Sequence, residues 1–133
     1  MPLAKEGQPG SFYRGLRLVS IDGNTLDVPD TEKNLAYFGR QNSSRGQSAF
    51  PQLRFVALCE SGTHTIFAVQ MGSYNTHETT LAANVLKELR PNMLCLADRL
   101  YSNFSLWEKA SATGAALLWR IRSNADLPVE KGA

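Results

Sequence analysis

The spacing of hydrophobic positions along the chain predicts its first strands. Apolar and β-branched residues dominate positions 16–28, which is typical of one long strand or of a hairpin. Two further strand-like runs follow at 53–58 (LRFVAL) and 65–71 (TIFAVQM), separated by the turn sequence ESGT at 60–63. These three runs predict an antiparallel meander.

The spacing becomes helical after this meander. Apolar residues recur on one face of positions 78–89, which predicts a helix with Thr76 as its N-cap and Pro91 beyond its end. The run at 93–97 (MLCLA) is short and wholly apolar, as in a strand that is buried on both faces of a sheet. A helix and then a buried strand are therefore expected here.

A second helix and a last strand complete the pattern. The helix is predicted at 102–113, where Ser105 and Glu108 have the spacing of a capping box and Gly114 is the expected stop. The apolar run at 116–121 predicts the final strand. Three strands followed by alternating helices and strands indicate an α/β fold with a mixed sheet.

The expected topology brings two acidic residues together. Right-handed crossovers through both helices would place the fourth and fifth strands beyond the first, so that the first and fourth strands are neighbours at the centre. Asp22 lies within the first strand-like run, and Asp98 directly follows the fourth. The order of elements alone therefore predicts that these two carboxylates come from adjacent central strands.

Composition and length are those of an ordinary globular domain. The chain has 133 residues, of which 43% are hydrophobic and 20% charged, and a net charge of +2 that permits nucleic-acid binding without arguing for it. The apolar runs are too short to cross a bilayer, and no signal-peptide pattern is present. Cys59 and Cys95 lie in strand-like runs without metal-ligand spacing, so a reducing, cytoplasmic location is expected.

Two segments do not fit the regular pattern. Residues 1–11 are rich in Pro and Gly and are expected to be a disordered tail. The polar stretch 29–51 is longer than most connections, and such loops are often functional. The expected division is thus a tail at 1–11, one folded domain at 12–125 and an unstructured end at 126–133.

The Asp22-Gly23 pair admits two interpretations. An Asp-Gly pair between apolar runs is a strong signal for a tight hairpin turn. A carboxylate in a central strand is costly unless it is paired, and a divalent cation is the usual partner when two acids converge. Mg²⁺ prefers hard oxygen ligands, and two such ions can assist the cleavage of a phosphodiester. The residues alone leave both interpretations open.

Three longer stretches carry a family resemblance. They are SIDGNTLDVPDTEKN, FGRQNSSRGQSAFPQLRFVAL and ADRLYSNFSLWEKASATGAALLWRIRSN. In this order they resemble the catalytic region of bacterial DDE transposases of the insertion-sequence-four type, from about Phe12 to Asn124. The resemblance implies a ribonuclease H-like fold and a DNA transposase core for metal-dependent strand cleavage and strand transfer at transposon ends.

The resemblance also assigns roles to individual residues. It implies that Asp22 and Asp98 are the first and second catalytic aspartates and bind Mg²⁺ or Mn²⁺. The implied partners are double-stranded DNA at transposon ends and, in a full-length synaptic complex, a second copy, with no membrane. Four arginines are expected to contact DNA: Arg40, Arg45 and Arg54 around the Gly/Ser segment, and Arg99 beside Asp98.

The chain departs from the family pattern in two places. Leu100 stands where the family usually has Gly after the second aspartate, and no Tyr-Arg-Glu-Lys type motif supplies the third acid. Glu130 follows Asp98 at a distance, but its surroundings contain Pro and Gly and lack helical spacing. The chain is therefore expected to be a fragment that is truncated before the third acidic residue and inactive alone.

Two other functions stay open on the residues. One is a catalytically dead DNA-binding or interaction remnant, which the missing third acid favours. The other is a phosphatase of the haloacid dehalogenase type, whose aspartyl nucleophile would stand at Ser20 in this chain. Asn24 also separates Gly23 from Thr25, so the phosphatase pattern fits poorly.

Overall fold

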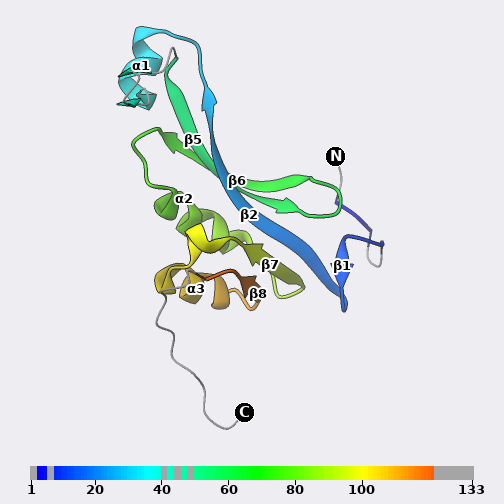
Figure 1. Cartoon of the computed structure of the whole chain (residues 1–133). Helices are drawn as coiled ribbons and strands as arrows, with labels where there is room; N and C mark the ends of the chain where they lie inside the picture. The colour runs from blue at the N-terminus through cyan, green and yellow to red at the C-terminus, as the bar shows by residue number, and fades with distance from the viewer. Residues whose placement is uncertain (1–2, 6–7, 40–41, 44–45, 48–49, 122–133) are drawn as a thin grey trace.

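The fold is an α/β arrangement around one twisted sheet (Figure 1). The computed structural model describes residues 3–5, 8–39, 42–43, 46–47 and 50–121. The strands of the main sheet are β1 (Phe12–Tyr13), β2 (Leu16–Asp27), β5 (Gln52–Glu60), β6 (Ile66–Ser73), β7 (Met93–Ala97) and β8 (Ala116–Trp119). The helices are α1 (Glu32–Phe38), α2 (Glu78–Val85), η1 (Leu86–Glu88), η2 (Arg99–Tyr101) and α3 (Phe104–Ser111). A separate two-stranded antiparallel sheet consists of β3 (Asn42–Ser43) and β4 (Gly46–Gln47).

The order of strands confirms the predicted topology. The sheet runs β6-β5-β2-β7-β8, with β1 paired to the start of β2. β2, β5 and β6 form the antiparallel meander, whereas β7 pairs in parallel with β2 and β8 in parallel with β7. The first long strand and the strand that ends before Asp98 are therefore neighbours at the centre of the sheet.

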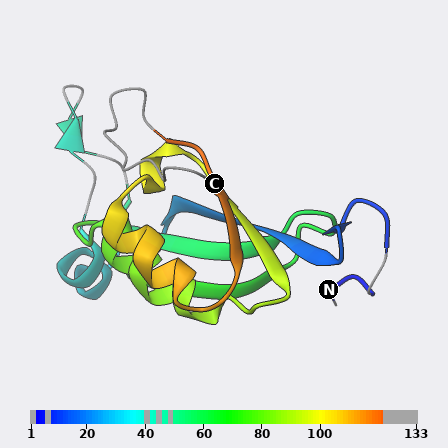
Figure 2. The ribbon, with the colours of Figure 1, turned by 90° about the horizontal axis from the view of Figure 1, so that it is seen from below.

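Both longer helices after the meander pack on one face of the sheet (Figure 2). Their apolar side chains form a single core with side chains from the central strands. The α2 contribution is Leu81, Ala82 and Val85; α3 adds Leu106 and Ala110; the strands add Val19, Ile21, Val56, Leu58, Cys95 and Ala97. Burial on this scale supplies the dominant free energy of folding. No helix in the part of the chain that the structure describes is long and apolar enough to cross a membrane.

The polar connection 29–51 contains a helix that the hydrophobic pattern did not predict. Thr31 is the N-cap of α1, and its hydroxyl accepts a hydrogen bond from the Asn34 N–H at 3.1 Å. Gly39 ends the helix with a positive φ of 79°. α1 has no buried residue, so it carries no apolar stripe from which helical spacing could be recognised.

The predicted caps of the two longer helices are each wrong by one or two residues. The N-cap of α2 is His77 rather than Thr76, and it makes no side-chain capping bond. The N-cap of α3 is Asn103 rather than Ser105, because the Asn103 side chain accepts hydrogen bonds from the N–H groups of Ser105 and Leu106. Asn103, three residues before the buried Leu106, is an alternative N-cap to the one that the capping-box spacing of Ser105 and Glu108 predicts.

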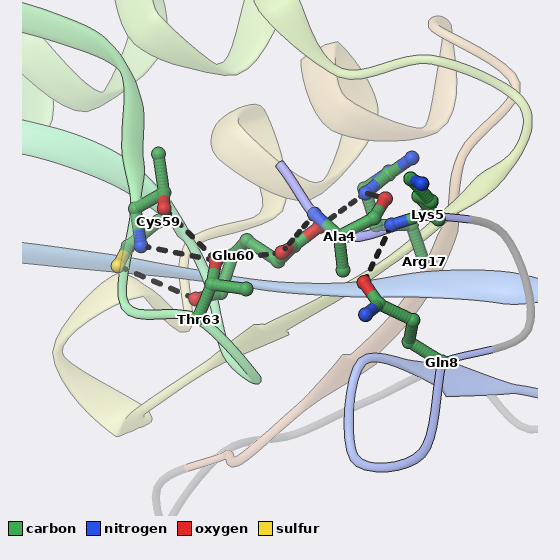
Figure 3. Close-up of polar contacts among 8 residues, drawn as sticks. Ala4, Lys5, Gln8, Arg17, Cys59, Glu60 and Thr63 are labelled. Carbon is green, nitrogen blue, oxygen red and sulfur yellow. Dashed lines mark hydrogen bonds and ion pairs between the residues drawn. The ribbon is translucent and has the colours of Figure 1, made fainter. Parts of the chain in front are cut away.

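Ala4, which lies within the tail expected at 1–11, is held to the sheet (Figure 3). Ala4 is buried, and its N–H donates to Glu60 Oε1 at 2.9 Å. Arg17 pairs with the other carboxylate oxygen of Glu60 and donates to the Ala4 carbonyl at 2.9 Å. Thr63 adds a hydrogen bond to Glu60 Oε1 at 2.6 Å.

Glu60 is fully buried yet charged, and its partners explain why. Burial alone raises the pKa of a carboxyl group. The hydrogen bonds from Thr63 and from the Ala4 N–H, together with the Arg17 guanidinium, outweigh burial and hold the pKa of Glu60 below its ordinary value. The ion pair therefore joins the N-terminal segment to β2 and to the turn after β5.

Candidate active site

Asp22 lies in the middle of a continuous strand, so the hairpin interpretation is wrong. β2 runs unbroken from Leu16 to Asp27, and Asp22 pairs in register with Ala57 of β5. Its neighbour Gly23 pairs with Val56 and does not adopt the left-handed conformation that a hairpin turn of this type would require. The Asp22 side chain is exposed, and its Oδ1 accepts a hydrogen bond from the Gly23 N–H at 2.9 Å.

Asp98 stands at the end of the adjacent strand. It follows β7 directly, keeps an extended backbone and caps the short helix η2. Its Oδ1 accepts a hydrogen bond from the Leu100 N–H at 2.7 Å, which orients the carboxylate. Leu100 contributes only its backbone N–H to this cap. Its leucine side chain, at a position where the family usually has Gly, therefore leaves the cap intact.

The strand register carries the two acids to matching positions of adjacent strands. The last parallel pair between β2 and β7 is Ser20 with Leu96. Asp22 lies two residues after Ser20, and Asp98 lies two residues after Leu96. Paired positions on neighbouring strands share a face and lie about 5 Å apart. The core residues Ile21 and Ala97 precede the aspartates and point to the helix-covered face. Asp22 consequently points to the opposite, exposed face, and Asp98 is exposed directly after the end of β7.

This exposed face also carries large apolar side chains near the carboxylates. Val69 aligns with Asp22 through Ala57, and Leu118 lies two strands away on the same face. Val69, Met71 and Leu118 keep 44%, 63% and 64% of their surface exposed. The acids thus lie on an open apolar sheet surface rather than in a deep pocket.

A polar cluster behind Gly23 escaped the sequence analysis. Tyr101 is fully buried and its hydroxyl donates to Glu78 Oε2 at 3.4 Å, while Arg54 pairs with Glu78 Oε1 at 3.0 Å. Burial raises the pKa of Tyr101, and the negative charges of Glu78, Asp22 and Asp98 raise it further. The hydroxyl is therefore electrostatically linked to both aspartates from the helix-covered side.

The sequence around each residue of this cluster indicated a different role. Glu78 has the position of an ordinary acidic residue in the first turn of a helix. Tyr101 follows the conspicuous Asp98 in a polar stretch, and Gly23 fits a hairpin turn equally well. Gly23, Glu78 and Tyr101 lie far apart in the sequence, and only the tertiary structure brings them together.

The four expected DNA-contacting arginines have different positions. Arg40 and Arg45 lie outside the described residues. Arg54 lies on the helix-covered side, where its guanidinium pairs with Glu78, donates to the Tyr74 carbonyl at 3.3 Å and stacks on the Tyr74 ring. Arg99 is exposed immediately after Asp98. DNA contact by these arginines stays a prediction.

The donor set at the two aspartates suits a hard cation. Mg²⁺ commonly binds through one or two protein carboxylates and completes its coordination with water and substrate phosphates. Two exposed carboxylates at matching positions of adjacent strands fit this requirement. Among the described residues, no group of three or more His, Cys, Asp or Glu side chains gathers in a way that could hold a metal, and Glu130 lies outside them.

Comparisons with known proteins identify a family and a similar fold. The family described as the transposase DDE domain matches residues 13–130. The transposase InsG for insertion sequence element IS4 of Escherichia coli K12 is 31% identical over 125 residues, which cover 94% of this chain and 27% of InsG. The putative transposase InsZ of the same strain is 32% identical over 110 residues, which cover 82% of this chain and 37% of InsZ.

A solved structure has a similar fold. A piggyBac transposase synaptic complex with hairpin DNA matches 91% of this chain and 25% of its own chain, with a TM-score of 0.52 and 16% sequence identity. This likeness concerns the fold and confirms the expected ribonuclease H-like architecture. The chain spans 27% and 37% of the lengths of the two curated relatives that it matches. Because the family match extends over residues 13–130, the chain belongs to the transposase DDE domain family.

Proposed function

We propose that this chain forms part of the catalytic core of a DNA transposase, in which Asp22 and Asp98 bind a divalent metal ion for strand cleavage and transfer. The observation that carries this proposal is the parallel register of β2 and β7: Asp22 and Asp98 each lie two residues beyond the last pair of that register, and both are exposed. The family relationship supports DNA as the substrate, with transposon ends as the cleaved sites and a second copy as the partner in a synaptic complex.

The proposed roles follow from the position of each side chain. Mg²⁺ or Mn²⁺, when bound, would polarise a phosphodiester and stabilise charge on the attacking and leaving oxygens. Asp22 and Asp98 would hold the ion, and the backbone N–H groups of Gly23 and Leu100 orient their carboxylates for it. The exposed guanidinium of Arg99 lies next in sequence to Asp98, where it can contact a DNA phosphate.

Metal-dependent stability provides the direct test. A ligand that binds only the folded state at ten times its Kd stabilises that state by about 1.4 kcal/mol. For a domain of this size, we expect Mn²⁺ to raise the melting temperature by roughly 5 °C. Asp22→Asn and Asp98→Asn should each abolish this rise. Without metal, each variant should melt at or slightly above the parent, because one of two like charges is removed.

A matched control is available on the same strand. Asp27 is another exposed acid of β2, and it accepts a hydrogen bond from Gln52 rather than facing Asp98. Asp27→Asn should retain the full Mn²⁺ response, as measured by differential scanning fluorimetry at several Mn²⁺ concentrations. If the parent and Asp22→Asn respond equally to Mn²⁺, the two aspartates do not form the metal site.

Catalysis by the chain alone should be weak or absent. Among the described residues, no group of three or more acidic, His or Cys side chains could hold a metal, so a second metal ion would lack a protein ligand there. We expect no nicking of supercoiled plasmid above background in Mg²⁺ or Mn²⁺. Strong metal-dependent nicking that Asp98→Asn abolishes would contradict this expectation and would require a third acid within the chain.

A DNA-binding remnant without catalysis is the second candidate, and the absence of a third acid near Asp22 and Asp98 among the described residues favours it. Plasmid retardation in a gel without any metal-dependent melting shift would support that candidate. The family match gives no support to the phosphatase alternative.

A further inference from the structure

We propose that Tyr101 is a positioning residue that sets the separation of the Asp22 and Asp98 carboxylates by bridging the backbone segments that carry them. This inference rests on the proposed metal site and concerns a residue that would not contact the metal. Tyr101 belongs to the short helix η2 that Asp98 caps, so its location is tied to that of Asp98. Its ring is buried among the core residues.

The contact with β2 is made at Gly23, the residue after Asp22. A Cβ atom at this position would lie 3.1 Å from the Tyr101 hydroxyl oxygen, 3.2 Å from Glu78 Cδ and 3.1 Å from the Phe55 carbonyl oxygen. These distances are shorter than ordinary van der Waals contact. A side chain here would have to displace its neighbours by a few tenths of an ångström, so glycine lets the Tyr101 hydroxyl lie against the strand. The Asp-Gly pair thus has a packing reason rather than a turn reason.

Hydrogen bonds and an ion pair fix the position of the hydroxyl. The Glu78 carboxylate accepts a hydrogen bond from the Tyr101 hydroxyl at 3.4 Å. The same carboxylate forms an ion pair at 3.0 Å with the guanidinium of Arg54, which lies on β5. Arg54 is in turn held by the Tyr74 carbonyl and ring. These contacts therefore connect β5 to the start of α2 and the start of α2 to η2. The Tyr101 hydroxyl at their end lies against Gly23 of β2, the residue after Asp22.

This arrangement has a consequence for metal binding. Two carboxylates on different strands share an ion well only if their separation is held within a few tenths of an ångström. Asp98 lies just beyond the last residue of β7, so the sheet ladder alone does not restrain it as it restrains Asp22. Tyr101 supplies the missing restraint. Removing supports of this kind typically weakens metal binding by about 10–100-fold.

The test compares Mn²⁺ affinity in variants that disturb the bridge. Tyr101→Phe keeps the ring but removes the hydroxyl, and Gly23→Ala places a methyl group against it. We expect each variant to raise the Kd for Mn²⁺ by about 10-fold, measured by the loss of the free-ion electron paramagnetic resonance signal. Circular dichroism establishes a temperature at which every variant is folded, and the affinities are measured there.

Two controls separate positioning from stability. Val85→Ala leaves a cavity in the core of α2 away from the carboxylates, so it should lower the melting temperature without changing the Kd. Tyr13→Phe removes a hydroxyl from an exposed tyrosine on β1 and should change neither quantity.

The outcomes distinguish this inference from the proposed function. Mn²⁺ binding that depends on Asp22 but is unaffected by Tyr101→Phe would overturn the positioning role and leave the metal site intact. Binding that is lost in proportion to stability in Val85→Ala as well would also overturn it. Binding by the parent that does not depend on Asp22 would refute the metal site, and the inference about Tyr101 with it.

Discussion

Replacing Arg17 with Ala should destabilise the protein by about 3–5 kcal/mol, because the Glu60 carboxylate would be left buried without its ionic partner. Arg17 also donates to the Ala4 carbonyl and lies over the Phe12 ring, so the N-terminal segment should loosen at the same time. The melting temperature should fall by roughly 10–20 °C. Thermal or urea unfolding at pH 7 measures the effect.

The pH dependence of the same variant provides a second readout. The pKa of Glu60 is lowered in the folded parent, so its stabilisation is complete above the ordinary value of about 4.3 and is lost as the pH falls through the lower folded value. In Arg17→Ala, burial dominates and should raise the pKa of Glu60, so that this protein loses stability as the pH rises instead. The difference between parent and variant should therefore shrink in acid.

An exposed ion pair serves as the control for this experiment. Arg90 pairs with Glu88 at 3.7 Å, and both side chains are more than half exposed. Because exposed pairs of this kind contribute little, Arg90→Ala should leave the melting temperature nearly unchanged at every pH. A small effect of Arg17→Ala, equal to that of Arg90→Ala, would show that Glu60 is not held by Arg17.

Two adjacent residues of β2 should respond in opposite ways to truncation. Ile21 is buried against the helices and pairs with Leu58, so Ile21→Ala should cost about 2–5 kcal/mol. Asp22 points to the exposed face, so Asp22→Ala should change stability by no more than about 0.5 kcal/mol in the absence of metal. Parallel denaturant titrations of the two variants measure the contrast.

The contrast tests the strand against the hairpin directly. In an unbroken strand, neighbouring side chains point to opposite faces and their burial differs accordingly. At the tip of a hairpin, both residues would lie near solvent and both truncations would be mild. Similar small effects at positions 21 and 22 would therefore contradict the position of Asp22 on β2.

The sequence by itself determined the order of the five long strands and the two longer helices, and it assigned Asp22 and Asp98 to neighbouring strands. Strand-like spacing at 16–28 and the apolar run at 93–97 were strong signals, because buried strands require apolar side chains at fixed intervals. The handedness of crossovers then left one arrangement in which the first and fourth strands meet. The family resemblance added the roles of Asp22 and Asp98, which stay proposals until metal binding is measured.

Only the tertiary structure decided how the neighbours of these acids are used. Local sequence could not distinguish a turn glycine from a packing glycine at Gly23, because the answer depends on Tyr101, which lies far along the chain. In the sequence, Arg54 has no feature that distinguishes it from a surface arginine, but in the structure it forms an ion pair with Glu78. Ala4 lies in a segment expected to be a loose tail, but its N–H donates a hydrogen bond to Glu60. Hydrophobic periodicity reports which face of an element is buried, whereas polar partners are fixed by contacts between distant segments, and those contacts leave no periodic signal in the sequence.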